Sequence, residues 1–101
     1  SYIDAVIMGP HLVIMDLFVT PPRRGRGDGL LQLQSATHRA MRSGCTWMLL
    51  DDASGRFRIP EHNIYVKSGF RYLSQGEPEM IGRTSTVSRR LKHLIGTNTS
   101  I

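Results

Sequence analysis

The pattern of hydrophobic positions predicts two strands and a helix in the first half of the chain. Residues 2–8 and 11–19 are rich in β-branched and aliphatic residues, and a Gly-Pro pair separates them, so we expect a β-hairpin. From Gly29 the period changes, because hydrophobic residues recur at steps of three and four, as on one face of a helix. Gly44 is expected to end this helix. Its hydrophobic face contains Leu30, Leu33, Thr37, Ala40 and Met41.

The second half is expected to continue with strands and helices. We predict a buried strand at residues 45–52, a loop at 53–59 and a short helix at 60–69. Two strands are predicted to follow at 70–74 and 79–83, and then a basic amphipathic helix at 85–96. Val87, Leu91 and Leu94 form the hydrophobic side of the last helix, and residues 97–101 are expected to be frayed. This order predicts an α/β fold of the α+β type, in which helices pack against a mixed sheet.

The composition is that of one small folded domain. The chain has 101 residues, of which 40% are hydrophobic, enough for a core and too many for a disordered segment. No hydrophobic run approaches the roughly 18 residues of a membrane span, and the first residues lack the pattern of a secretion signal. Cys45 is the single cysteine, which we interpret as a small core residue. A reducing, cytoplasmic setting without membrane contact is therefore expected.

The net charge of +5 is unevenly distributed. Residues 80–101 contain four basic and no acidic residues, whereas residues 1–79 contain nine basic and eight acidic residues. A basic end of this kind attracts nucleic acid, an acidic protein or a polyanionic cofactor. A solvated basic surface that only keeps the protein soluble is an equally open interpretation.

The segment VTPPRRGRGDGLLQL, residues 19–33, joins a predicted strand to a predicted helix through a turn rich in glycine and arginine. Glycine permits backbone conformations in which successive N–H groups point at one phosphate, and the start of a helix adds partial positive charge. Arginine side chains add full charges. The segment lacks the Lys-Ser or Lys-Thr of a Walker loop and the glycine spacing of a dinucleotide fingerprint. A phosphate site of another kind is therefore predicted.

One phosphate-binding pattern does fit. Val-x-Pro-x-x-Arg-x-x-Gly-x-Gly, formed here by Val19, Pro21, Arg24, Gly27 and Gly29, resembles the acetyl-coenzyme A signature of the GNAT N-acetyltransferase superfamily. Further along, NIYVKSGFRY is similar to the family's LYxKxGF segment, through Tyr65, Lys67, Gly69 and Phe70. The two motifs stand in the family's order, one predicted strand apart, and the resemblance covers residues 12–82.

The resemblance implies a fold and a co-substrate. Two parallel strands, at residues 13–19 and 46–52, would part in a V-shaped opening that receives the pantetheine arm of acetyl-coenzyme A. The arm would pair with backbone groups near Phe18 and Val19, and the pyrophosphate would lie on the N–H groups of residues 24–29. The cofactor-binding residues that the resemblance implies are Phe18, Val19, Arg24, Gly25, Arg26, Gly27, Asp28, Gly29 and Leu30.

The resemblance also implies the reaction, which is direct transfer of acetyl to a primary amine without a covalent enzyme intermediate. Tyr65 matches the family's tyrosine that protonates the coenzyme A sulfur, and a backbone N–H near Val19 would polarise the thioester carbonyl. Asp16, an acid within an apolar strand, is the candidate base. The alternatives are an ordinary half-buried tyrosine, a structural or solvent-facing carboxylate, and proton relay by water. Asp51 and Asp52 either hold a cationic acceptor or cap a turn.

The sequence departs from the family pattern in three ways. Asp28 stands where the family is usually aliphatic, so it either caps the helix or opposes the pyrophosphate. Arg58 stands where the family often has an asparagine, and Asn63 does not inherit that role automatically. The family's first strand and two early helices are lacking, and residues 83–101 add a basic C-terminal helix to the core at residues 1–82. The acceptor side is therefore expected to be open, completed by a second chain, or fitted to a large substrate.

These observations predict a cytoplasmic N-acetyltransferase that uses acetyl-coenzyme A and acts on a primary amine, such as a lysine or an N-terminus of a macromolecule. An acceptor on a protein and a homodimer are the partners that we consider, and the sequence decides neither. The alternative is a catalytically inactive module of the same fold, which binds nucleic acid or an acidic protein through the arginine-rich loop and the basic helix.

Overall fold

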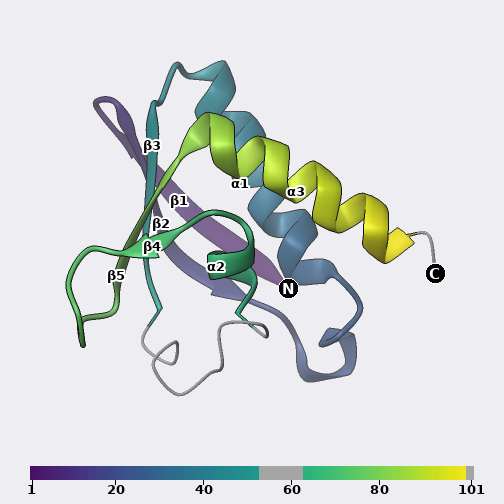
Figure 1. Ribbon diagram of the computed structural model, residues 1–101. Coiled ribbons are helices and arrows are strands. Elements are labelled where there is room, and N and C mark those ends of the chain that lie inside the picture. The colour runs from purple at the N-terminus through teal and green to yellow at the C-terminus, as the bar shows by residue number, and fades with distance from the viewer. Residues whose placement is uncertain (53–62, 100–101) are drawn as a thin grey trace.

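The computed structural model describes residues 1–52 and 63–99, which form a mixed sheet and its helices (Figure 1). The strands are β1 (Tyr2–Met8), β2 (His11–Phe18), β3 (Trp47–Asp51), β4 (Arg71–Tyr72) and β5 (Glu79–Arg83). The helices are the 3-10 turn η1 (Pro21–Arg23), α1 (Asp28–Arg42), α2 (Ile64–Lys67) and α3 (Thr84–Thr99). The expected loop at residues 53–59, which contains Arg58, and the first residues of the helix expected at 60–69 lie outside the described residues.

The strand order is β1-β2-β3-β5-β4. β1 and β2 form the expected antiparallel hairpin, in which the turn residue Gly9 has a φ of 59°. β2 and β3 are parallel, because α1 carries the chain back across the sheet, and β5 then inserts antiparallel between β3 and β4. The predicted mixed sheet is therefore confirmed.

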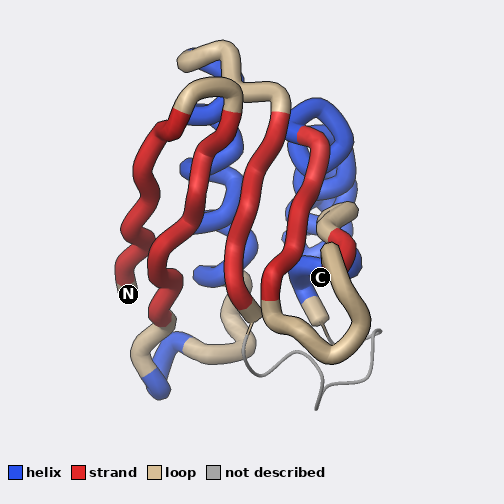
Figure 2. Tube along the Cα trace, turned by 90° about the vertical axis from the view of Figure 1, so that its left-hand side faces the viewer, coloured by secondary structure: helices blue, strands red, loops and turns tan. Residues whose placement is uncertain are grey.

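Helices α1 and α3 pack on each other and on the same face of the sheet (Figure 2). The spacing of apolar residues in α1 buries Leu33, Thr37 and Ala40, as predicted, together with Ala36. Met41 was expected in this stripe but is 51% exposed, whereas its neighbour Ala40 is buried, so Met41 lies outside the buried side of α1. The buried core consists of Leu12, Ile14, Leu33, Ala36, Ala40, Cys45, Met48, Leu50, Phe70, Met80, Val87 and Leu91. We call the other side of the sheet, which faces the viewer in Figure 2, the open face.

The bounds of β4 and α3 differ from the prediction. β4 has only two residues, because after Leu73, whose N–H donates to the carbonyl of Glu79, the chain turns through Gly76 with a φ of 85°. α3 begins directly after β5 and continues through Gly96 to Thr99, so residues 97–99 are helical rather than frayed. A glycine inside a helix costs about 1 kcal/mol relative to alanine, which is not enough to end it.

Candidate functional site

β2 and β3 part from one another halfway along β2. Their parallel pairing begins at His11 with Trp47 and ends at Ile14 with Leu50. β2 then continues to Phe18, whereas β3 ends at Asp51. The opening expected between these two strands is therefore present.

A β-bulge in β2 coincides with this parting. On its other edge β2 pairs with β1, where Asp4 faces Asp16 and the next residue, Ala5, faces Ile14. Met15 is thus an extra residue in β2, placed directly after the last pair with β3. A bulge bends and twists the strand that carries it, so it turns the end of β2 away from β3.

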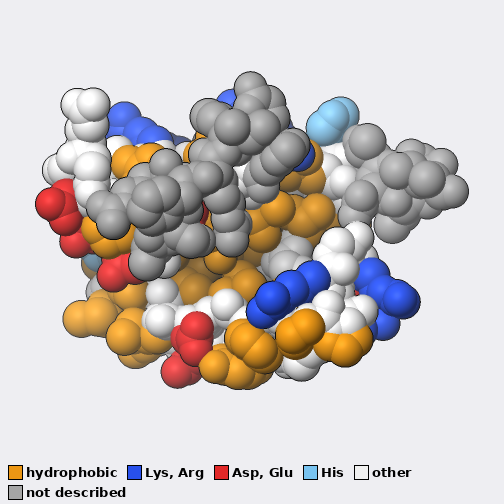
Figure 3. All heavy atoms as spheres, turned by 90° about the horizontal axis from the view of Figure 1, so that it is seen from below, with side chains coloured by type: hydrophobic (Ala, Val, Ile, Leu, Met, Phe, Trp, Pro, Cys, Tyr) orange, Lys and Arg blue, Asp and Glu red, His pale blue; other side chains and the backbone are white. Residues whose placement is uncertain are grey.

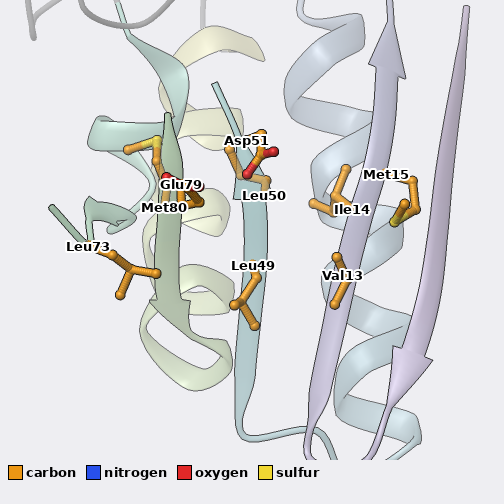
Figure 4. Close-up of a pocket in the computed structure, with 9 residues that line it drawn as sticks. All are labelled: Val13, Ile14, Met15, Leu49, Leu50, Asp51, Leu73, Glu79 and Met80. Carbon is orange, nitrogen blue, oxygen red and sulfur yellow. The ribbon is translucent and has the colours of Figure 1, made fainter. Parts of the chain in front are cut away.

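A hollow of about 210 Å³ lies on the open face where the strands part (Figure 4). It is lined by Val13, Ile14, Met15, Leu49, Leu50, Asp51, Leu73, Glu79 and Met80. Most of these side chains are apolar, and the carboxylates belong to Asp51 and Glu79, which face each other across β3 and β5. The hollow is smaller than the roughly 300–1,000 Å³ of pockets that enclose a drug-sized ligand, and its size suits a single side chain.

The glycine loop, residues 19–27, leads from the end of β2 into α1. Gly25 and Gly27 have φ values of 79° and 84°, in the left-handed region where other residues are strained. The first turn of a helix leaves its N–H groups without intrahelical acceptors. Within the described part of the chain, five successive or nearly successive N–H groups have no hydrogen-bond partner, namely those of Gly25, Gly27, Asp28, Gly29 and Leu30.

Two other N–H groups of this segment, which were expected to face a pyrophosphate, are hydrogen-bonded to backbone carbonyl groups of the protein. The Arg24 N–H donates to the carbonyl of Pro21 at 3.2 Å, and the Arg26 N–H donates to the carbonyl of Arg23 at 3.3 Å. The cause is the 3-10 turn at Pro21–Arg23, which tightens the start of the loop. The available donors are therefore shifted toward the first turn of α1.

Asp28 forms an ion pair within this loop. It is the first residue of α1 and not its N-cap, which is Gly27, so the expectation of a capping side chain is wrong. The Arg23 guanidinium donates from Nε and Nη2 to the two carboxylate oxygens of Asp28, each at 3.0 Å. This hydrogen-bonded pair lowers the pKa of Asp28 and raises that of Arg23. The negative charge of Asp28 is thereby compensated beside the free N–H groups.

Arginine side chains crowd this end of the molecule. Arg24 donates from Nε to the carbonyl of Val19 at 3.1 Å, and its guanidinium lies 6.0 Å from the centre of the Phe18 ring. Arg23, Arg24 and Arg26 are all exposed. Figure 3, a view of the end at which β2 finishes, shows Lys and Arg side chains gathered at the lower right, beside hydrophobic side chains. An anion approaching the glycine loop thus meets positive charge.

Helix α2 brings Tyr65 close to the start of α1. A Cβ atom built on Gly29 would lie 3.2 Å from Cδ1 of Ile64, the neighbour of Tyr65 in α2. The Tyr65 ring is half-buried and meets the ring of Phe70 edge to face, with centroids 6.3 Å apart. The two motifs of the sequence therefore meet in space, although 35 residues separate Gly29 from Ile64 in the chain.

A buried polar cluster fixes the start of α2. Asn63, which is 1% exposed, is the N-cap, and its Oδ1 accepts the N–H groups of Tyr65 at 2.9 Å and Val66 at 3.3 Å. Its Nδ2 donates to Oδ2 of Asp52, which is 6% exposed, at 3.0 Å. Sequence reasoning missed this role of Asn63, although an asparagine directly before a short helix is an N-cap signal. Asp52, which we expected either to hold a cationic acceptor or to cap a turn, holds this amide through its carboxylate.

Asp16 lies on the open face of β2 and is exposed. Its Oδ2 accepts a hydrogen bond of 2.6 Å from the Tyr2 hydroxyl, and this bond raises the pKa of Tyr2. The Tyr2 ring in turn lies against Phe18, with centroids 5.7 Å apart. Asp16 is therefore a partnered surface carboxylate near the parting and not a buried one.

The described residues form neither a metal site nor a membrane-spanning helix. The residues at 1–52 and 63–99 include no group of three or more His, Cys, Asp and Glu side chains that could hold a metal ion. None of the helices formed by these residues has both the length and the apolar character needed to cross a membrane.

The fold is similar to that of acetyltransferases of known structure. No protein-family model matches the sequence, and no curated protein matches it. The crystal structure of nourseothricin acetyltransferase is similar, with a TM-score of 0.63 and 22% identity, over 81% of this chain and 56% of that chain. The 1.9 Å structure of an acetyltransferase from Bacillus cereus is similar with a TM-score of 0.66 and 28% identity, over 80% of this chain and 61% of that chain.

The first of these likenesses concerns the fold alone, because so few residues are identical. The chain spans about three fifths of the length of each of the two proteins. The chain thus has the acetyltransferase fold, and its predicted resemblance to the GNAT superfamily is confirmed.

Proposed function

We propose that the protein is an N-acetyltransferase, which transfers acetyl from acetyl-coenzyme A to a primary amine. The observation that carries the proposal is the set of five unpartnered N–H groups in the glycine loop and the first turn of α1, beside the parting of β2 and β3. A diphosphate offers several acceptor oxygens with negative charge, and each hydrogen bond to a charged group stabilises a complex by about 1.5–3 kcal/mol. The dipole of α1 and the exposed arginines add attraction for the same group.

The pantetheine arm would follow the edge of β2 that β3 leaves uncovered, from Met15 to Phe18. In the described part of the chain the N–H of Val19 has no hydrogen-bond partner. It is the donor that we assign to the thioester carbonyl, whose oxygen becomes negative during the reaction. Phe18, Val19, Gly25, Gly27, Asp28, Gly29 and Leu30 would bind through the backbone, and Arg24 and Arg26 through their side chains.

The chemistry is a direct displacement. The amine nitrogen attacks the carbonyl carbon, the tetrahedral intermediate expels the thiolate of coenzyme A, and the amine loses one proton. Tyr65 is the proposed acid, because a neutral phenol can donate its proton to the departing sulfur. Asp16 is the proposed base, acting directly or through water, at the cost of its hydrogen bond with Tyr2. The acceptor would approach on the open face, where the hollow receives an aliphatic amine side chain beside Asp51. A protein lysine or N-terminus suits this open approach.

Thermal denaturation with and without millimolar acetyl-coenzyme A tests the proposal. At 100 times its Kd a ligand contributes about 2.7 kcal/mol, which in a domain of this size corresponds to a rise in Tm of roughly 10–20 °C. Release of free thiol in the presence of a panel of amines and peptides then tests transfer. The absence of any thermal shift would refute the proposal. Salt-dependent binding of nucleic acid by a protein that transfers no acetyl would favour the alternative of an inactive module.

A further inference from the structure

The buried pair of Asp52 and Asn63 links the end of β3 to the helix that carries Tyr65. Asp52 is fixed to the sheet, because its N–H donates to the carbonyl of Pro78 at 2.9 Å, in the segment before β5. Its carboxylate accepts the Asn63 side chain at 3.0 Å. The Tyr72 hydroxyl lies 3.4 Å from both Oδ2 of Asp52 and Nδ2 of Asn63, at the outer limit of hydrogen bonding. Of these three side-chain contacts, the Asp52–Asn63 bond is the shortest.

The orientation of the Asn63 amide is determined from both sides. A carboxylate is an acceptor only, so it requires the NH2 group of Asn63, whereas backbone N–H groups are donors and require its oxygen. If the amide were turned over, it would lose its bond to Asp52 and both bonds to α2. Asp52 thus holds Asn63 in the one orientation that binds the N–H of Tyr65.

The buried pair of Asp52 and Asn63 is expected to add little net stability to the folded domain. A buried carboxylate loses its hydration, and apolar residues in its place are often neutral or stabilising. The hydrogen bonds of the pair do fix the orientation of the groups that they join, which apolar contacts do not. α2 has only four residues, so its own hydrogen bonds are too few to hold it in place.

We propose that Asp52 and Asn63 are positioning residues, which hold the backbone of Tyr65 so that its hydroxyl faces the departing sulfur. This proposal rests on the acetyl transfer proposed above and names residues that need not touch either substrate. It predicts that loss of the pair lowers kcat through Tyr65 and leaves the KM for acetyl-coenzyme A within about threefold, because the phosphate-binding N–H groups belong to the glycine loop and the first turn of α1 and not to α2.

An exchange of the two side chains provides the matched variant. Asn63→Asp alone brings two carboxylates together in a buried site, and it should lower kcat at least tenfold at pH 8. The double variant Asp52→Asn, Asn63→Asp places the amide directly after β3 and the carboxylate at the N-cap, where aspartate also accepts N–H groups. We expect it to recover kcat to within about threefold of the wild type. Cys45→Ala, a buried change in the connection between α1 and β3, is the control for a general loss of stability.

The decisive measurement is a double-mutant cycle with Tyr65→Phe. If the pair acts through the Tyr65 hydroxyl, Asn63→Asp has no further effect on kcat once that hydroxyl is absent. An equal loss of kcat in both backgrounds, or an exchanged double variant as impaired as Asn63→Asp, would overturn the proposal.

A second measurement does not depend on activity. Amide hydrogen exchange at Tyr65 and Val66 should be at least tenfold faster in Asp52→Ala than in Cys45→Ala, although Asn63 itself is unchanged. Unchanged exchange at both amides would overturn the positioning role even in an active enzyme. Faster exchange in a protein that neither binds acetyl-coenzyme A nor transfers acetyl would instead refute the proposed function and keep the link between Asp52 and Tyr65.

Discussion

The variant Gly25→Ala tests whether the left-handed conformation of the glycine loop is needed to direct its N–H groups at acetyl-coenzyme A. Gly25 has a φ of 79°, and a Cβ atom there would have no heavy atom within 4 Å. Gly44, at the other end of α1, has a φ of 74° and is equally open. Alanine at either position therefore meets no clash and only the strain of the left-handed region, about 1–2 kcal/mol. Gly44→Ala is thus the matched control.

The two variants should lose similar stability and differ in binding. A loss of 1 kcal/mol lowers the Tm of a domain of this size by roughly 4–8 °C. If the loop at Gly25 relaxes to a negative φ, its N–H turns away and one hydrogen bond to a charged oxygen, worth about 1.5–3 kcal/mol, is lost. Since 1.36 kcal/mol is a factor of ten, the Kd for acetyl-coenzyme A should rise about 10- to 150-fold in Gly25→Ala.

Isothermal titration calorimetry at a temperature where all three proteins are folded measures this difference. We expect Gly44→Ala to keep the Kd of the wild type within about twofold. Equal Kd values for both variants would refute the reasoning, whether both are weakened or neither is, because the strain is the same and only the position differs.

Three further predictions follow from single contacts. Tyr65→Phe should lower the rate of acetyl transfer at least tenfold and leave the Kd for acetyl-coenzyme A unchanged, and a rate equal to that of the wild type would exclude Tyr65 as the acid. Gly82→Ala should lower the free energy of unfolding, measured in urea, by about 1–3 kcal/mol, because its Cβ would lie 2.8 Å from a methyl group of Val87. The double variant Gly82→Ala, Val87→Ala should recover part of this loss. The hydrogen bond from Arg23 lowers the pKa of Asp28 from 3.8. The contribution of this ion pair to the stability of the fold is therefore complete above pH 3.8 and is lost as the pH falls through the lower pKa of Asp28 in the folded protein. The Tm difference between wild type and Asp28→Asn should therefore shrink below about pH 4, and a constant difference would contradict the pair.

The elements could be predicted because their signals are local. The period of apolar residues located α1, and the order of strand, glycine loop and helix carried the motif from Val19 to Gly29. The parallel pairing of β2 and β3 was implied by the resemblance to the GNAT superfamily, and the crossover through α1 is its physical basis. The prediction for Met41 was wrong, because a step of four residues from Thr37 does not show that Met41 lies outside the side of α1 that buries Ala36 and Ala40.

The details of the site depend on contacts that the sequence does not display. The bulge at Met15 arises from the register between β1 and β2, and neither glycine nor proline marks it. The loss of the Arg24 and Arg26 N–H groups follows from a 3-10 turn, which the two prolines permit but do not require. The Asp52–Asn63 bond joins residues eleven positions apart, and no local pattern at either residue identifies the other as its partner.

The central claim is that the free N–H groups at the start of α1 bind the diphosphate of acetyl-coenzyme A. Its most direct test is a titration of the 15N-labelled protein with acetyl-coenzyme A and, separately, with pantetheine, which lacks the diphosphate. We expect saturable shifts of the amide resonances of Gly25, Gly27, Gly29 and Leu30 with acetyl-coenzyme A only. Binding of acetyl-coenzyme A that leaves these four resonances in place would contradict the claim.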